Sequence, residues 1–167
     1  WTWGQNNFGQ LGLGNTTYYS SPKQVGSLTA WLKVASGLYF IMATKTDGTL
    51  WAMGKNSYGQ LGDGTQLQRT TPVPVASSVL VVAGGADHSL FAKTDGTLWA
   101  MGFNGNGQLG DGTTTQRNSP VQVATGVSAV AAGAYHASYL KTDGTLWAFG
   151  YNGAGQLGDG TTTQRNL

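Results

Sequence analysis

Two histidines are the side chains of this chain best suited to acid–base or metal chemistry near neutral pH. His88 and His136 lie 48 residues apart at the same position of two consecutive repeats, and Phe40 takes that position one repeat earlier. A metal site or an acid–base pair needs several such groups to converge, whereas these two belong to separate repeats. The phenylalanine indicates a structural position, so we predict histidines that pack between strands.

A glycine-rich segment containing one aspartate recurs along the chain. It reads GQLGDGTTT at residues 107–115, and Asp63, Asp111 and Asp159 take the same place in successive repeats. The segment resembles a phosphate-binding loop and a calcium-binding repeat, but it lacks the GK[ST] ending of the first and the G-G-x-G-x-D register of the second. Asp-Gly favours turns in which the carboxylate accepts backbone hydrogen bonds, so we expect turn residues. Calcium binding by these loops is the alternative.

No arrangement of side chains in the sequence predicts catalysis. It contains no Ser-His-Asp constellation, no pair of carboxylates at a fixed spacing and no nucleotide-binding fingerprint. We therefore predict that the protein is not an enzyme, and we assign no catalytic residue, cofactor or metal. Aromatic residues in or beside loops are better candidates for recognition, because aromatic side chains dominate interface energetics. The candidates, for which packing between repeats is the alternative role, are Phe8, Tyr18, Tyr19, Tyr58, Phe103 and Tyr151.

Charge is sparse, and this limits the classes of partner. Charged residues make up 10% of the 167 positions, the net charge is +2, and there is no cysteine to form a disulfide. Lysine and arginine are scattered, so we expect no nucleic-acid partner. No apolar run approaches the roughly 18 residues of a transmembrane segment, so we expect no membrane span. The abundance of Thr, Asn, Gly and Gln favours an extracellular or cell-surface protein of bacterial type.

The elements that position these side chains follow from a repeat. Aligned on tryptophan at offsets of 50, 48 and 48 residues, the four copies are WTWGQNNFGQLGLG from Trp1, WAMGKNSYGQLGDG from Trp51, WAMGFNGNGQLGDG from Trp99 and WAFGYNGAGQLGDG from Trp147. Repeats of this length bury their apolar faces against their neighbours, so no copy folds alone. The whole chain is therefore one tandem-repeat segment, with units at about 1–50, 51–98, 99–146 and a shortened 147–167.

Each unit predicts four short strands. Between Val79 and Gly102 the segments VLVVAGG, HSLFAKT and TLWAMG are rich in β-branched and aromatic residues and are separated by turn signals. Asp95-Gly96 predicts a two-residue type I′ hairpin between the second and third strands. A fourth strand, PVQV from Pro120, is expected at the sheet edge because proline cannot donate to a central ladder. Four antiparallel strands per period predict the blade of a β-propeller.

Two more sets of residues are interpreted as packing devices. A glycine follows each tryptophan-bearing strand, where we expect the neighbouring blade to approach closely. These glycines are Gly54, Gly102 and Gly150. The leucines of the GQLG segments are expected to plug between blades. They are Leu61, Leu109 and Leu157.

The motif W-x-x-G-x-N-x-x-G-Q-L-G-x-G, with its proline strand and G-x-x-H-S strand, resembles the regulator of chromosome condensation repeat over nearly the whole chain. Bacterial members are similar in their DGTLWAMG and GQLGDGTTTQRN strings. The resemblance implies an all-β fold of four-stranded blades, about three and a half of them here, from a propeller of about seven. It also implies guanine-nucleotide exchange, which in the family relies on a protruding element for which these unit lengths leave no room.

The predicted function is a non-catalytic structural or protein-interaction module, a scaffold at a bacterial surface or in an extracellular assembly. Glycan binding through loop aromatics is the alternative, and nucleotide exchange is a third. The strand count of one plus three sets of four predicts an open arc with exposed blade faces. We therefore expect a segment of a longer propeller or, as the alternative, a chain whose partners are copies of itself.

Overall fold

The computed structural model describes residues 1–27 and 30–167, and within these ranges it contains thirteen antiparallel strands and no helix. In chain order the strands are β1 (Thr2–Gly4), β2 (Tyr19–Lys23), β3 (Trp31–Ser36), β4 (Phe40–Lys45), β5 (Leu50–Gly54), β6 (Arg69–Ala76), β7 (Val79–Gly84), β8 (His88–Lys93), β9 (Leu98–Gly102), β10 (Arg117–Ala124), β11 (Val127–Ala132), β12 (His136–Lys141) and β13 (Leu146–Gly150). The described part of the chain therefore has no helix long and apolar enough to cross a membrane.

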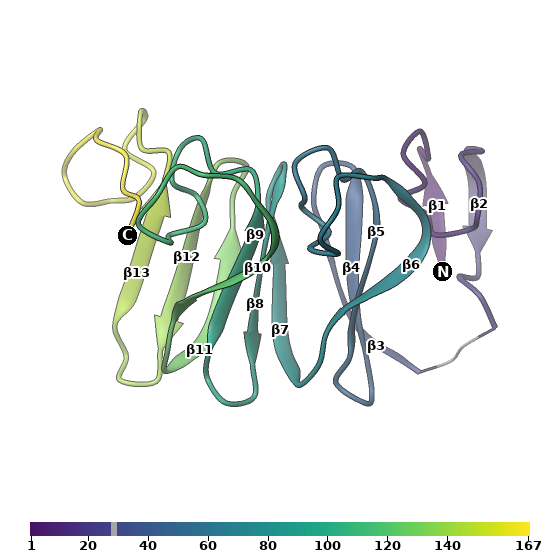
Figure 1. Ribbon diagram of the computed structural model, residues 1–167, viewed down its shortest axis with the longest axis horizontal. Helices are drawn as coiled ribbons and strands as arrows, with labels where there is room; N and C mark the ends of the chain where they lie inside the picture. The colour runs from purple at the N-terminus through teal and green to yellow at the C-terminus, as the bar shows by residue number, and fades with distance from the viewer. Residues whose placement is uncertain (28–29) are drawn as a thin grey trace.

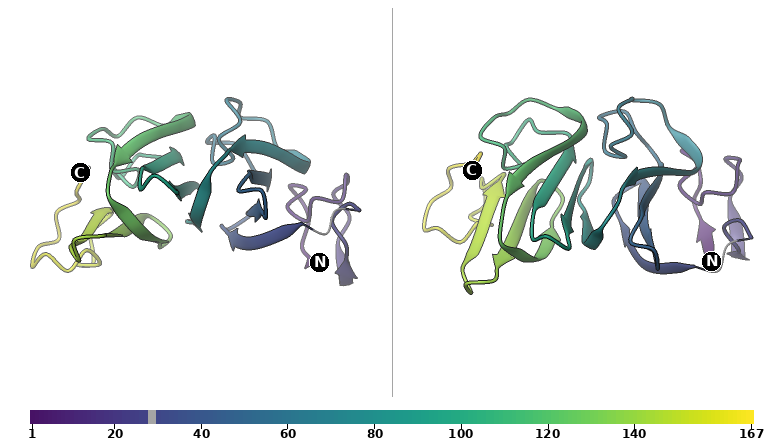
Figure 2. Two further views of the ribbon diagram at one scale, coloured as in Figure 1. Left: turned by 90° about the horizontal axis from the view of Figure 1, so that it is seen from below. Right: turned by 60° about the horizontal axis from the view of Figure 1, so that its bottom comes forward.

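The strands form four sheets that stand side by side along an arc, with the termini at its opposite ends (Figures 1 and 2). Two sheets are complete blades, ordered β3-β4-β5-β6 and β7-β8-β9-β10, and they are flanked by β1-β2 on one side and β11-β12-β13 on the other. Strand β7 contacts both β3 and β11, so the first strands of neighbouring blades meet. The predicted all-β fold of four-stranded propeller blades is confirmed.

Blades and sequence units are out of phase. In the first complete blade, β3 and β4 lie in unit 1–50 and β6 lies in unit 51–98. Strand β5 begins at the last residue of the first unit and continues into the second. Each complete blade therefore takes strands from two units. Its sheet hydrogen bonds tie consecutive units together, as expected where no unit folds alone.

The proline-bearing strands lie at sheet edges, as predicted. Strand β6 pairs with β5 alone and β10 pairs with β9 alone among the described strands. Pro72 and Pro74 are in β6 and Pro120 is in β10. An edge position tolerates these residues because one side of the strand has no ladder to which an N–H must donate.

The predicted type I′ hairpin is wrong, because the turn is one residue longer. Gly96 N donates to Lys93 O at 3.0 Å and Lys93 N donates to Thr97 O at 2.9 Å, which closes a three-residue loop. Gly96 has a φ of +78° while Asp95 keeps a negative φ. The Asp95 carboxylate instead accepts hydrogen bonds from the Thr97 amide and hydroxyl, and Trp99 Nε1 donates to that hydroxyl at 2.8 Å. Aspartate therefore ties the turn to the following strand, and glycine alone supplies the left-handed residue.

The core lies between blades, and the GQLG leucines fill it where two blades meet. Leu61 is fully buried with Phe91 and Met101 of the next blade, and Leu109 is fully buried with Tyr139 and other residues of the blade after that. Burying a leucine in this way stabilises a protein by about 1.5 to 3 kcal/mol. The plug prediction is confirmed at these two positions, whereas Leu157 is half-buried.

The glycines that end the tryptophan strands permit a close approach of backbone. Gly102 has a φ of +106°, and a Cβ atom there would lie 2.5 Å from Asp87 O in its own sheet and 3.2 Å from Gln60 Cα in the preceding blade. Gly54 and Gly150 have the same environment. The predicted close contact is therefore confirmed, and a side chain at these positions would separate the long loop from the blade.

Candidate functional site

The two ends of the blades differ in construction. One end carries the three-residue hairpins at 46–48, 94–96 and 142–144. The opposite end, here called the loop face, carries the long loops and lies at the top of Figure 1. It consists of the loops at 55–68, 103–116 and 151–164, the equivalent loop at 5–18, and the turns at 37–39, 85–87 and 133–135.

One buried asparagine organises each long loop. The Asn104 side chain is fully buried, and its Nδ2 donates to the carbonyl oxygens of Thr113 and Thr115, each at 3.1 Å. Its Oδ1 accepts a hydrogen bond from Leu109 N at 2.9 Å. Sequence reasoning missed this role, although the signal was available as the asparagine that recurs in every copy of the motif. The equivalent residues are Asn6, Asn56 and Asn152.

The aspartate of each long loop is a turn residue, as predicted. Asp111 Oδ1 accepts hydrogen bonds from the Thr113 amide and hydroxyl at 3.0 and 2.7 Å, and its Oδ2 accepts one from Arg117 Nε at 2.8 Å. Partial burial opposes ionisation, but the bonds from Thr113 and Arg117 outweigh it and hold the pKa of Asp111 below its usual value. Residues 1–27 and 30–167 contain no group of three or more His, Cys, Asp or Glu arranged for a metal ion.

The loop face carries positions that differ between repeats. Within the constant frame of glycine, asparagine, glutamine and leucine, three positions change strongly from one repeat to the next. In order along the chain, their occupants are Tyr39, Asp87 and Tyr135 at the short turn, Lys55, Phe103 and Tyr151 at the start of the long loop, and Tyr58, Asn106 and Ala154 three residues later. Of these nine residues, sequence reasoning identified Tyr58, Phe103 and Tyr151.

A cation bridges two blades on this face. Lys55 Nζ lies 2.9 Å from Asp87 Oδ1, and both side chains are largely shielded from solvent. The ammonium also lies 5.4 Å from the ring centroid of Tyr58 and 6.0 Å from that of Tyr39. Gln60 Nε2 donates to the same carboxylate oxygen at 2.9 Å. The Lys55–Asp87 pair carries no net charge, and the rings of Tyr39 and Tyr58 lie beside it.

Aromatic pairs continue the same surface across blade junctions. Phe8 lies against Tyr39 with ring centroids 5.2 Å apart, and Tyr58 lies against Phe103 at 5.1 Å. Both pairs are tilted, a favourable arrangement for aromatic rings. Phe8, Tyr58 and Phe103 are half-buried, so each contributes to blade packing and also presents part of its ring to solvent.

The remaining predicted aromatics lie toward the two ends of the arc. Tyr151 is 40% exposed on the loop face of the last blade, close to the 47% exposed Tyr135. Tyr18 is exposed and donates a hydrogen bond to Asn7, the neighbour of Phe8 in the first long loop. Tyr19 is different because it begins β2, where its hydroxyl accepts a hydrogen bond from Asn15.

The histidines belong to the packing of the blades. His88 is fully buried against Gly85, in the place that Phe40 occupies against Gly37. Burial, with a smaller contribution from nearby His136, lowers the pKa of His88 to about 4. Within the described residues its two ring nitrogens have no hydrogen-bond partner. The predicted structural role is confirmed for His88, whose buried ring takes the place of Phe40 one repeat earlier, whereas His136 is half-buried.

A chain of four-stranded antiparallel sheets, joined by plugging leucines and arranged along an arc, is an array of β-propeller blades. The sequence profile of the regulator of chromosome condensation (RCC1) repeat matches residues 1–44, 47–92 and 95–140, and a second profile of this repeat matches 31–60, 79–108 and 127–156. The chain belongs to the RCC1 repeat family.

Solved structures show the same fold. Prp20p from Saccharomyces cerevisiae, described with its binding to Gsp1p and histones, has a TM-score of 0.86 and 23% identity over 99% of this chain. The yeast RCC1 (Prp20) bound to Kap60 has a TM-score of 0.83 and 22% identity over 99% of this chain. Human WBSCR16 has a TM-score of 0.78 and 24% identity over 90%. The chain spans 42% to 44% of the length of these proteins.

Proposed function

We propose that this chain is a non-catalytic protein-interaction module and that the loop face is its contact surface. The observation that carries the proposal is a contrast within the loop face. The residues whose side chains hold the long loops together are the same in each repeat, whereas other positions on this face differ from repeat to repeat, as at Lys55, Phe103 and Tyr151. Exposed side chains on a rigid frame are a common basis of recognition.

The chemistry of the loop face favours a protein partner. Tyrosine or phenylalanine occupies five of the nine variable positions, and the two charged residues among them, Lys55 and Asp87, form an ion pair with each other. Aromatic groups are enriched at the anchoring positions of protein interfaces, and charge is depleted at interface centres. A shallow hollow of about 260 Å³, lined mainly by glycine and alanine from three blades, lies beside these residues. The yeast structures, described with Kap60, Gsp1p and histones, add support by analogy.

The proposal includes a setting. We place the module in a scaffold of an extracellular or cell-surface assembly, which the low charge and the abundance of threonine, asparagine and glutamine favour. In this setting equivalent contacts on successive blades would engage a repetitive partner or copies of the same protein. The support for this part of the proposal is compositional.

A matched pair of variants tests the proposal. Phe103→Ser, Tyr135→Ser and Tyr151→Ser together remove the aromatic side chains from the third and fourth repeats' part of the loop face, while Thr94→Ser and Thr142→Ser change the hairpin end and serve as control. Partners are captured by cross-linking and mass spectrometry from cells of the source species, and each is then purified and titrated. We expect partner affinity to fall by roughly a hundredfold in the first variant and to be unchanged in the second. Equal affinity in both would remove the loop face from the proposal.

A nucleotide-exchange assay separates this function from that of an exchange factor. The chain is added to a small GTPase loaded with fluorescent GDP, and nucleotide release is followed over time. We expect no acceleration. Accelerated release that is lost in the triple serine variant would assign an exchange function to the same surface.

A further inference from the structure

Trp31 is a departure from the repeat that changes the environment of one lysine. Valine stands at this position in the next two blades, as Val79 and Val127. Trp31 is the direct cross-strand partner of Lys45, so the two side chains lie on the same face of the sheet. Lys45 Nζ lies 5.1 Å from the centroid of the Trp31 ring and 3.7 Å from that of Trp51. The ammonium is therefore held between two indoles.

The next blade provides a comparison. Lys93 occupies the equivalent position and lies 4.8 Å from the single ring of Trp99, with Val79 as its cross-strand partner. Lys93 is half-buried, whereas Lys45 is 8% exposed. The additional indole has thus turned a partly hydrated lysine of the repeat into a buried one.

Lys45 Nζ forms no ion pair within the part of the chain that the structure describes. The nearest carboxylate in sequence, that of Asp47, accepts hydrogen bonds from the Thr49 amide and hydroxyl at 2.9 and 2.6 Å and forms no ion pair with Lys45. Two aromatic faces compensate part of the lost hydration of a cation. An anion beside this ammonium would add a charge-assisted hydrogen bond.

A cavity of about 220 Å³ opens beside these side chains. Trp31, Lys45 and Trp51 form one side of it. The other side is largely apolar: Thr71 and Pro72 come from β6 of the same sheet, and Gly12, Val25 and Gly26 come from the segments that adjoin the β1-β2 sheet. This space exceeds the roughly 150 Å³ of an engineered cavity that binds benzene.

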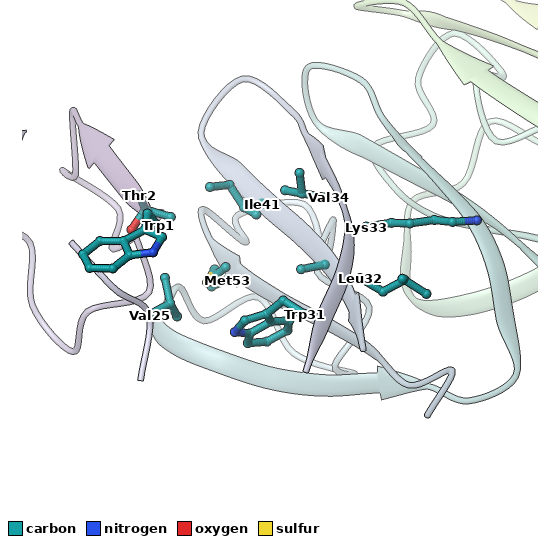
Figure 3. Close-up of a pocket in the computed structure, with 10 residues that line it drawn as sticks. Trp1, Thr2, Val25, Trp31, Leu32, Lys33, Val34, Ile41 and Met53 are labelled. Atoms are coloured by element: carbon teal, nitrogen blue, oxygen red, sulfur yellow. The ribbon is translucent and has the colours of Figure 1, made fainter. Parts of the chain in front are cut away.

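A second polar atom faces the same region without a partner. Trp31 Nε1 is buried and donates no hydrogen bond to any described residue. In Figure 3 the nitrogen edge of the Trp31 indole faces Val25, and these two residues also line an adjoining apolar cavity of about 210 Å³. A lysine that forms no ion pair and a buried N–H donor without a described partner therefore line the same largely apolar cavity.

We propose that this cavity binds a small monocarboxylate with a compact apolar body. The carboxylate accepts hydrogen bonds from Lys45 Nζ and Trp31 Nε1, and the apolar body packs against Trp51, Val25 and Pro72. One cation and one N–H match a single negative charge, whereas a phosphate would leave most of its acceptor oxygens unpaired in an apolar cavity. The site lies near the hairpin end of its blade, so it is independent of the function proposed for the loop face.

Benzoate, benzamide and benzylamine are the probes, because they share a ring and differ in charge. Each is titrated into the uniformly ¹⁵N-labelled chain, and the indole N–H resonances are followed by NMR. The Trp31 resonance is assigned by its disappearance in Trp31→Phe. We expect saturable binding of benzoate with the largest shift at Trp31, and binding of neutral benzamide weaker by about tenfold to a hundredfold, because a hydrogen bond to a charged group is lost. Equal binding of all three probes, or no binding of benzoate, would overturn the proposal.

Matched lysine variants separate a binding site from a structural cation. Lys45→Met removes the buried charge, and Lys93→Met removes its equivalent over a single indole. We expect benzoate affinity to fall about tenfold or more in Lys45→Met and to be unchanged in Lys93→Met. Trp31→Val, which recreates the environment of Lys93, is expected to abolish binding while the other indole resonances keep their positions. Benzoate binding retained in Trp31→Val would reject the site even if Lys45→Met fails to fold.

Discussion

At the hairpin end of the blades the same side chains make the same bonds three times, whereas on the loop face equivalent positions carry unrelated side chains. Asp95, Thr97 and Trp99 form one continuous series of hydrogen bonds, and the series recurs in the preceding and following blades. On the loop face Lys55 is followed 48 residues later by Phe103. Because both ends are built from the same repeat, the repeat itself does not explain the difference. The two ends differ in which side chains the fold requires to be constant.

This difference distinguishes two sets of residues. The constant residues, here called the frame, hold the loops and sheets together, and the variable residues form the surface of the loop face. Side chains that satisfy buried backbone groups cannot change without cost, because an unpaired buried polar group loses its hydration and gains nothing in return. Asn104 is such a side chain, and its neighbour Phe103 is not. A repeat protein can therefore vary recognition at one end of its blades while the sheets and their junctions stay the same.

The largest expected effect is the loss of a frame asparagine. Asn104→Ala leaves the Leu109 amide and the Thr113 and Thr115 carbonyl groups without their buried partner, so we expect a loss of roughly 3 to 4 kcal/mol in the free energy of unfolding. Chemical denaturation followed by tryptophan fluorescence measures it. The matched control is Asn106→Ala in the same loop, since Ala154 occupies that position in the next repeat. Comparable losses in the two variants would contradict the division between frame and surface.

A smaller effect appears as a pH dependence at the buried histidine. His88 has a pKa lowered from 6.5 to about 4, so between these values the unfolded chain binds a proton that the folded chain does not. Stability therefore falls as the pH drops through this window, by up to about 3 kcal/mol from this group. In His88→Phe, which introduces the residue found at position 40, we expect this dependence to disappear.

The aspartates give a separate signal at lower pH. Hydrogen bonds lower the pKa of Asp63 and Asp111 below 3.8, so their contribution is present above that value and is lost as the pH falls further. That loss is expected both in the wild-type chain and in His88→Phe. Denaturation curves collected from pH 7 to pH 3 distinguish the two windows, and a fall between pH 6.5 and 4 that survives in the variant would exclude His88 as its cause.

The third effect tests the hairpin end. Gly96 has a left-handed φ of +78°, and a Cβ atom there would meet nothing closer than 3.5 Å. Gly96→Ala should therefore cost the backbone strain alone, about 1 to 2 kcal/mol. Gly96→Asn should cost less, because asparagine enters this conformation more readily. Thermal unfolding of both variants provides the measurement, and a more stable alanine variant would show that the turn geometry is different.

Much of this construction was predictable from the sequence, because the repeat amplifies local signals. The prolines placed edge strands, and the GQLG leucines marked the junctions between blades. The hairpin geometry was not predictable from Asp-Gly alone, since the two turn types differ in which residue bears the positive φ. In the observed turn the carboxylate of Asp95 accepts hydrogen bonds from Thr97, the residue before β9.

The candidate site was predictable only in part, for a related physical reason. Phe8, Tyr58, Phe103 and Tyr151 were recognisable as loop aromatics. Their partners come from other repeats, as when Lys55 contacts Asp87 across a blade junction, and such pairs leave no local pattern in the chain. Lys45 could not be recognised from the sequence because the same lysine recurs in each repeat. The residue that differs is Trp31, which is distant from Lys45 in sequence but pairs with it in the sheet.

The smallest effect on stability, and the sharpest test of the comparison, comes from making two loop faces alike. Lys55→Phe with Tyr58→Asn gives the second long loop the residues of the third at both of its variable positions, while every frame residue is kept. The exchange removes the ion pair with Asp87 and the Tyr58–Phe103 contact, which together are worth about 1 kcal/mol or less at a partly exposed surface. We expect the unfolding free energy to change by no more than this, as measured by chemical denaturation, while affinity for a loop-face partner changes by roughly tenfold or more. A large loss of stability would place these side chains in the frame, and unchanged affinity would show that variation on the loop face does not determine recognition.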